Sequence, residues 1–283
     1  MASTPESITK ALAPARQAFY QSIWQEHFPK LNLNGSSNIS ISDIEMAETL
    51  LSWLKDSHHD LPKGISIPST PSNIASSPTS PTQPQLPLKT LDPTLAKIAN
   101  IKLLDETEAI PDDSLTHAFA HIDVHHHSLT LPLLKQIFYS LIPKGIAVIS
   151  ITKHNPLASI LSSILSTSSR RNSTSSLDDV PIATEQDIRD LAEKAGFEVG
   201  KIRISERRIE VRGKEELVRL RGEMERILDM AVGQRGDAQS WERGFDGVWE
   251  AEMAKNGGDS EGQRSLGVEC WVLVAMKWDL LCA

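Results

Sequence analysis

Five acid-base side chains gather in one short segment near the middle of the chain: His121, Asp123, His125, His126 and His127. A neutral imidazole titrates near pH 7 and can accept a proton, so His121, His125 and His126 are candidate general bases. Two other interpretations stay open, in which the histidines are solvated or structural, or bind a metal. Neighbouring positions on one segment do not form a coordination shell without a distant ligand, so no metal is expected.

The histidine cluster stands at the end of a predicted strand. The run 116–124 is short and mostly apolar between polar residues, whereas 145–151 is β-branched and typical of a strand buried on both faces. Between them, apolar residues at helical spacing predict a helix over 129–142, which ends at the turn Pro143-Lys144-Gly145. Strand, helix and strand together predict a βαβ unit.

Hydrophobic periodicity predicts further elements on either side of this unit. Ser42-Asp43-Ile44-Glu45 and Thr184-Glu185-Gln186-Asp187 have the spacing of capping boxes, and Gly196 suits the end of the helix that begins after Thr184. Pro14 and Pro29 are expected to bound the first helix. Helices are predicted over about 15–28, 42–56, 185–195, 217–231 and 241–253, and strands over 197–211 and 268–276.

Two polar stretches predict flexible loops, one near 66–88 and one near 166–179. From Ser66 to Thr82, thirteen of seventeen residues are Ser, Thr or Pro. Such a stretch has too few apolar groups to offset the entropy cost of ordering.

A nucleophilic Ser-His-Asp site is not supported by the sequence, because the chain has no Gly-x-Ser-x-Gly elbow.

Composition limits the classes of partner. The chain has 283 residues, and 29 Lys and Arg against 37 Asp and Glu give a net charge of -8, which argues against nucleic acid as the main partner. The start lacks the basic and apolar regions of a leader, and no run approaches the ~20 apolar residues that span a bilayer, so no membrane association is expected. Cys270 and Cys282 are too few for a disulfide framework, which favours a reducing, cytoplasmic location.

The order of these segments resembles the class I S-adenosylmethionine-dependent methyltransferases, especially the small-molecule enzymes of fungal metabolic clusters. The best part runs from 101 to 151 and includes Asp105, Ile110-Pro111-Asp112-Asp113-Ser114 and Leu141-Ile142-Pro143-Lys144-Gly145, where the family usually reads Leu-Lys-Pro-Gly-Gly. Ala195-Gly196-Phe197 and the run 268–277 are similar to the segments around two late strands of the family's sheet.

The resemblance implies a Rossmann-like α/β fold, with a seven-stranded, mostly parallel sheet, helices on both faces and an antiparallel last strand. A ligand would lie at the carboxyl ends of the strands, where the strand order reverses. It implies S-adenosylmethionine as cofactor and a small molecule of secondary metabolism as methyl acceptor. The expected organisation is a helical segment over 1–60 and a methyltransferase-like domain over 61–283.

The resemblance also assigns roles to individual residues. Asp92, taken as the end of the second strand, would accept hydrogen bonds from the ribose hydroxyls, and Asp105 and Glu106, after the third strand, would contact adenine. A histidine of the cluster would take a proton from a substrate hydroxyl. The alternatives are an Asp92 that caps a turn or helix before Pro93, and a solvated loop at Asp105 and Glu106.

The family's glycine-rich turn after the first strand has no counterpart here. Only Gly35 and Gly64 precede Gly145. If residues 64–68 are the first strand, the Ser/Thr/Pro-rich stretch takes the place of that turn, and prolines replace glycine poorly. Two alternatives to an active enzyme therefore stay open: a catalytically inactive protein of this fold that acts as a binding or assembly partner, and an imperfect gene model over 66–88.

Overall fold

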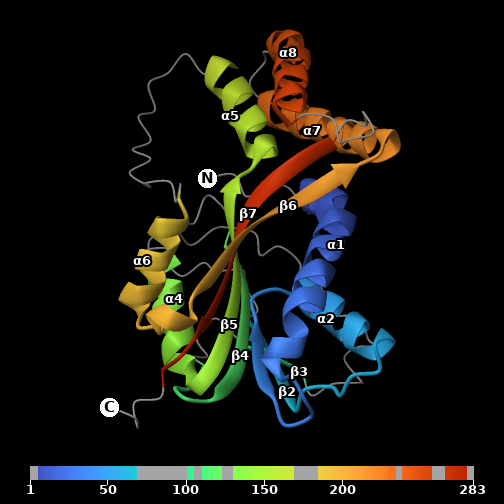
Figure 1. The fold of residues 1–283 in the computed structure, drawn as a ribbon. Helices are drawn as coiled ribbons and strands as arrows, with labels where there is room; N and C mark the ends of the chain where they lie inside the picture. The colour runs from blue at the N-terminus through green and yellow to red at the C-terminus, as the bar shows by residue number, and fades with distance from the viewer. Residues whose placement is uncertain are drawn as a thin grey trace. The chain divides into compact units, whose positions relative to one another are not determined.

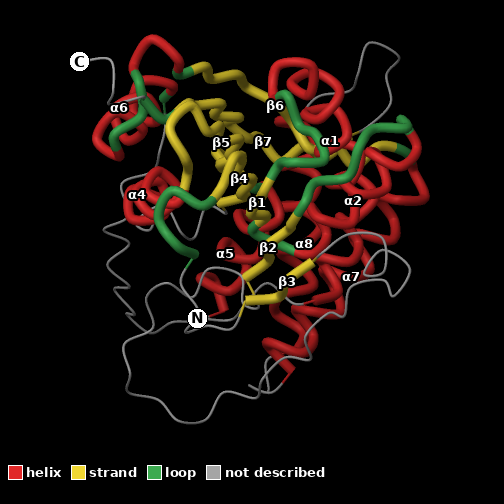
Figure 2. Tube along the Cα trace, turned by 90° about the horizontal axis from the view of Figure 1, so that it is seen from below, coloured by secondary structure: helices red, strands yellow, loops and turns green. Residues whose placement is uncertain are grey.

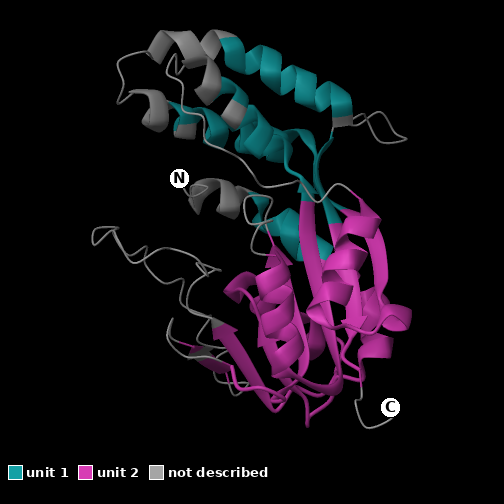
Figure 3. Ribbon diagram, turned by 90° about the vertical axis from the view of Figure 1, so that its left-hand side faces the viewer, with its two compact units in different colours: residues 1–19, 153–178, 208–270 teal, residues 20–152, 179–207, 271–283 magenta. Residues whose placement is uncertain are grey.

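The computed structural model describes residues 6–68, 101–104, 110–122, 130–168, 184–233, 238–256 and 265–278. The chain divides into two compact units, each of which is described by itself (Figure 3). Unit 1 comprises residues 1–19, 153–178 and 208–270, and unit 2 comprises residues 20–152, 179–207 and 271–283.

The strands form a seven-stranded sheet in the order β3-β2-β1-β4-β5-β7-β6 (Figure 1). The pairs from β3 to β5 are parallel, whereas the bridge between Phe197 and Lys277, just after β7, is antiparallel. The order reverses between β1 and β4. This architecture confirms the predicted Rossmann-like, mostly parallel sheet. The strands are β1 (Asn38–Ile41), β2 (Gly64–Pro68), β3 (Ile101–Leu104), β4 (Leu115–Ile122), β5 (Leu141–His154), β6 (Arg203–Arg212) and β7 (Ser265–Met276).

Helices cover both faces of the sheet in unit 2 (Figures 1 and 2). Helices α4 (Thr130–Ser140) and α6 (Glu185–Ala195) pack through Leu134 and Ile188 against buried residues of β4 and β5. On the other face lie α2 (Ile44–Asp56) and the second half of α1 (Glu6–Leu31). There Trp24 meets Phe119 of β4 edge to face, with ring centroids 4.7 Å apart.

Unit 1 has a hydrophobic core of its own. It is built on α5 (Pro156–Ser168), α7 (Lys214–Gly233) and α8 (Ala238–Asn256). Ile160, Met224 and Phe245 are fully or almost fully buried in it. Helices α7 and α8 confirm the two helices predicted over 217–231 and 241–253.

Several local predictions are confirmed at the level of single residues. Thr184 and Asp187 form the predicted capping box of α6, and Gly196 ends that helix with a left-handed φ of 110°. Such a φ favours glycine because a Cβ would clash with the backbone. The strand predicted over 197–211 is β6, which begins at Arg203 after the short 3-10 helix η2 (Val199–Lys201); Ile209 and Val211 are its buried residues.

Helix α1 is longer than the sequence indicates. It runs from Glu6 to Leu31, so Pro14 and Pro29 lie within it and do not bound it. A proline inside a helix costs about 3 kcal/mol, which is why the sequence favours a stop at each. Buried apolar residues extend from Leu12 to Leu31, and Tyr20 and Trp24 among them are 1% exposed, so burial of this face outweighs that cost.

The predicted loops and the predicted domain boundary fall partly outside the described residues. Residues 66–68 belong to β2 and residues 166–168 to α5, so these six residues are not in loops; residues 69–88 and 169–179 lie outside the described residues, and the loops there stay predictions. The segment 1–60, predicted as helical, holds α1 and α2 and also β1, which pairs with β2 and β4. The boundary at residue 60 stays a prediction.

A buried lysine closes the amino edge of the sheet. The Nζ of Lys277 donates to Oδ1 of Asp113 at 2.7 Å and to the carbonyl oxygens of Tyr139 and Leu141 at 3.3 and 2.6 Å. It also lies 5.0 Å from the ring centroid of Phe138. Because Tyr139 is in the last turn of α4, one cation satisfies carbonyls where that helix ends and β5 begins.

We expect Lys277→Met to lower the free energy of unfolding by roughly 1.5–3 kcal/mol, the value of hydrogen bonds to a charged group. The methionine keeps the apolar stem of the side chain but cannot donate to the carbonyls of Tyr139 and Leu141. Urea unfolding followed by circular dichroism measures this change, and a variant as stable as the wild type would contradict the role of Lys277.

Two buried histidines predict sensitivity to acid. Burial lowers the pKa of His117 below its ordinary value of 6.5, although a hydrogen bond with the Leu31 carbonyl acts in the opposite direction. Burial, then Lys30 and Arg203, lower the pKa of His27. The unfolded chain therefore binds protons first as the pH falls below about 6.5, and stability is lost from there down to the folded pKa values.

We expect His117→Gln to reduce the loss of unfolding free energy between pH 7.5 and pH 5.5. The exposed His58 provides the control, since His58→Gln should leave that loss unchanged. Urea unfolding at the two pH values makes the comparison, and equal losses in wild type and His117→Gln would show that His117 does not contribute.

Candidate functional site

The strand order reverses between β1 and β4, and the candidate site lies at the carboxyl ends of these two strands. Strands β1 and β4 are parallel neighbours, with Ile41 opposite Phe119, and β2 and β5 lie on their outer sides. In open α/β sheets the loops after two such strands separate to opposite faces and leave a crevice, which is the usual ligand site. The residues that follow β1 and end β4 therefore define the candidate site.

The connection between β1 and α2 consists of Ser42 and Asp43 alone. The amide of Ser42 donates to the carbonyl of Phe119 at 2.9 Å, and the Oγ of Ser42 accepts from the amide of His121 at 3.0 Å. Asp43 is the N-cap of α2, and its Oδ1 accepts from the amide of Met46 at 2.8 Å. The turn is thus closed by its own side chains and fastened to β4.

This turn corrects two predictions. The first strand is β1, not residues 64–68, which form the second strand. The N-cap of α2 is Asp43 and not Ser42, because Ser42 uses its hydroxyl to bind β4. Two residues that carry a Cβ therefore occupy the place where the resemblance implies a glycine-rich turn.

His121 is the member of the predicted histidine cluster that the structure describes. Its Nδ1 lies 2.7 Å from Oγ of Ser150 and its Nε2 lies 3.5 Å from Oγ1 of Thr152, both on β5. Tyr20 of α1 meets the ring edge to face, at 6.4 Å between centroids. Since both ring nitrogens face hydroxyls of the neighbouring strand, this geometry favours a structural role for His121 over that of a proton acceptor for substrate.

The remaining predicted site residues, Asp92, Asp105, Glu106, His125 and His126, lie outside the described residues. The strand ends nevertheless fix the order of the chain. Strand β3 ends at Leu104, so Asp105 and Glu106 follow the third strand as predicted. Strand β2 ends at Pro68. Asp92 therefore does not directly follow the second strand, and the prediction that placed it there is wrong. The roles of these acids and histidines stay predictions.

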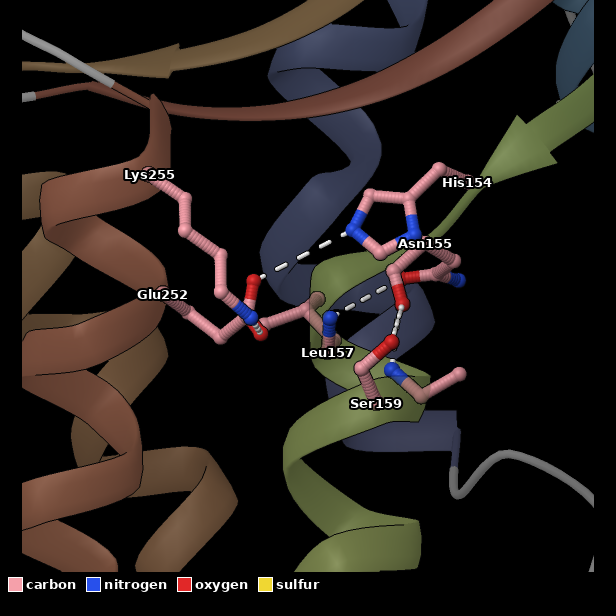
Figure 4. Close-up of polar contacts among 7 residues, drawn as sticks. His154, Asn155, Leu157, Ser159, Glu252 and Lys255 are labelled. Carbon is pink, nitrogen blue, oxygen red and sulfur yellow. Dashed lines mark hydrogen bonds and ion pairs between the residues drawn. The ribbon is translucent and has the colours of Figure 1, made fainter.

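Unit 1 contains a separate polar group around Glu252 of α8 (Figure 4). The Glu252 side chain is 7% exposed, and its carboxylate lies 2.6 Å from Nζ of Lys255 and 3.9 Å from Nε2 of His154. Next to His154, Asn155 caps α5 by accepting from the amide of Leu157 at 3.1 Å. The Lys255 ammonium group pairs with the buried carboxylate, which is a structural use of these groups.

Sequence reasoning missed Ser150, Thr152 and Tyr20 at the carboxyl edge and Glu252 in unit 1. Ser150 and Thr152 stand in an apolar strand, where their alternate positions were the only signal that they share one face. Glu252 and His154 are far apart in the sequence, so spacing carries no signal of their contact.

The described part of the chain contains neither a metal-binding cluster nor a membrane-spanning helix. Among these residues, no group of three or more His, Cys, Asp or Glu could hold a metal ion. No described helix combines the length and the apolar character that crossing a bilayer requires.

Comparison with known proteins reveals likeness of fold only. No family model matches the chain, and no curated protein matches it. The YcgJ protein of Bacillus subtilis has a TM-score of 0.51 at 9% identity, with 93% of this chain and 99% of that chain covered. A provisionally assigned methyltransferase of Bacillus halodurans has a TM-score of 0.49 at 12% identity, over 91% and 100% of the two chains. Phosphoethanolamine N-methyltransferase 2 of Haemonchus contortus, solved with S-adenosylhomocysteine, has a TM-score of 0.44 at 13% identity, over 90% and 53%.

We expect Asp43→Ala to cost about 1 kcal/mol of unfolding free energy, the usual value of an N-cap, and Asp43→Asn to cost only a few tenths. Asparagine keeps the oxygen that accepts from the Met46 amide and removes the charge. Chemical denaturation of both variants tests this. If Asp43→Asn lost as much unfolding free energy as Asp43→Ala, the stability of the turn would depend on the carboxylate charge and not on the hydrogen bond to the Met46 amide.

Proposed function

We propose that this protein is an S-adenosylmethionine-dependent methyltransferase that acts on a small molecule, in the cytoplasm and in secondary metabolism. The observation that carries the proposal is the sheet: seven strands in the order β3-β2-β1-β4-β5-β7-β6, with the reversal between β1 and β4. The residues that resemble the family on sequence fall on the corresponding elements, since Leu141-Ile142-Pro143-Lys144-Gly145 opens β5 and Ala195-Gly196-Phe197 ends α6.

The end of β1 does not fit this cofactor in the way the resemblance implies. A glycine cradle lets the backbone approach a ligand, whereas Ser42 and Asp43 carry side chains that are hydrogen bonded to β4 and α2. The first turn of α2 also has its Met46 amide satisfied by Asp43, so it offers a poor site for an anionic group. The proposal therefore requires that the cofactor be held by Asp92, in the connection between β2 and β3, and by Asp105 and Glu106, which follow β3.

The proposal gives the histidine cluster two different tasks. When bound, S-adenosylmethionine supplies a methyl group on a sulfonium centre. His121 orients the end of β4 through its contacts with Ser150 and Thr152. His125 or His126, which follow β4 in the sequence, would accept the proton of the acceptor hydroxyl at an imidazole nitrogen.

One observation favours a second function, a binding or assembly partner that has lost the cofactor. The Ser42-Asp43 turn is complete without a ligand, since Ser42 Oγ and Asp43 Oδ1 have their partners within the protein. A turn whose polar atoms are hydrogen bonded within the protein serves stability, and such a protein would act through its surface.

Titration calorimetry with S-adenosylhomocysteine separates the two functions. We expect saturable binding, and Asp92→Asn and Asp105→Asn should each weaken it by roughly 1–3 kcal/mol, the range for hydrogen bonds to a charged group. Asp43→Asn is the matched control, because it removes a carboxylate from the same edge but should leave binding unchanged.

Two outcomes would contradict the proposal. No heat at millimolar ligand would favour the partner function, and pull-downs would then be the next step. Unchanged binding in Asp92→Asn would remove Asp92 from the site, and unchanged binding in both variants would overturn the account of how the cofactor is held.

A further inference from the structure

The amino edge of the sheet, opposite to the expected cofactor edge, contains a hollow. Its volume is about 580 Å³, within the 300–1,000 Å³ that is typical of small-molecule sites. The hollow lies entirely in unit 2. Residues from the end of α1, the start of β5, η2 and the end of β7 line it.

The lining of this hollow is positively charged in a protein that is acidic as a whole. Lys30, Lys144, Lys201 and Lys277 line it, and Glu198 is the one acid among the described lining residues. Lys277 is committed to Asp113 and two carbonyls, as described above. Lys30, Lys144 and Lys201 are exposed, so three cations face solvent around the hollow although the net charge of the chain is -8.

Lys144 adopts a backbone conformation that favours glycine. Its φ is +65°, in the left-handed region where a Cβ is strained. Its amide donates to the carbonyl of Lys277 at 3.0 Å, which holds the start of β5 against the end of β7. Glycine would adopt the same backbone without strain, so the lysine is retained at a cost, and strain of this kind is concentrated at functional sites.

An exposed aromatic side chain also lines the hollow. Trp278 is 49% exposed, although an indole ring is largely buried in most proteins. A ring in this position can stack on a flat aromatic ligand, and the nearby cations can pair with charged groups on the same ligand.

We propose that this hollow binds a small phosphorylated ligand that carries an aromatic ring, of the nucleoside diphosphate class. Lys30, Lys144 and Lys201 attract the phosphates, and Trp278 stacks on the ring. A diphosphate carries enough negative charge to engage several lysines together, which a single carboxylate does not. This site is separate from the carboxyl edge and does not depend on the proposed methyl transfer.

ADP is the probe, with adenosine and inorganic pyrophosphate as its two halves, and titration calorimetry of the full chain is the measurement. We expect ADP to bind at least tenfold more tightly than either half, because both the ring and the phosphates contribute. Trp278→Leu should weaken ADP binding at least tenfold. Saturating S-adenosylhomocysteine should not displace ADP, which separates this site from the one at the carboxyl edge.

Lys144→Gly provides the sharpest variant, because it removes the cation and relieves the strain. We expect its melting temperature to equal or exceed that of the wild type, while its affinity for ADP falls at least tenfold. His58→Gly is the matched control, since His58 also has a positive φ, of 55°, but does not line the hollow. It should bind ADP like the wild type.

Three results would overturn the proposal. One is no ADP binding at millimolar concentration, and another is pyrophosphate binding as tight as that of ADP, which would indicate nonspecific attraction of anions. The third is wild-type affinity in Lys144→Gly, which would place any bound nucleotide elsewhere, whatever the melting temperature of the variant.

Discussion

The short connection between β1 and α2 is the constraint on which the candidate site depends. Ser42 binds the Phe119 carbonyl and the His121 amide of β4, and Asp43 binds the first turn of α2. Each of these hydrogen bonds contributes on the order of 1 kcal/mol, and together they fix strand, helix and neighbouring strand at the point where the sheet order reverses. A connection held in this way has little freedom to rearrange around a ligand. Any cofactor at this edge must therefore obtain its contacts from the other strand ends.

The two edges of the sheet use their polar and charged side chains differently. At the carboxyl edge, His121 of β4 contacts Ser150 and Thr152 of β5, and its amide donates to Ser42 after β1. At the amino edge, the buried Lys277 donates hydrogen bonds to carbonyls where α4 ends and β5 begins. The other lysines around the hollow are exposed. The described polar groups of the carboxyl edge therefore hold the strands together, and the exposed lysines of the amino edge present charge to solvent.

Local sequence signals predicted many of the individual helices and strands, whereas the sheet architecture was predicted from the family resemblance. The capping box of α6, the left-handed Gly196 and the helix between β4 and β5 follow from short-range rules and are where those rules place them. Strand β1 escaped prediction because four residues, Asn-Ile-Ser-Ile, are too short for an alternating pattern to stand out. Its place is set by distant partners, such as Thr116, whose Oγ1 donates to the Asn38 carbonyl. The site was predicted less well, because the roles of Ser42 and His121 depend on contacts across strands that no spacing in the sequence reveals.

Hydrogen exchange of the backbone amides, measured with and without saturating S-adenosylhomocysteine, tests the central claim most directly. If the cofactor is held from the ends of β2 and β3, protection should increase in the segments after those strands, 69–100 and 105–109. The amides of Ser42 and Met46, which already have partners within the protein, should exchange at the same rate in both samples. Ligand-induced protection confined to the β1–α2 connection, with no change after β2 and β3, would contradict the account.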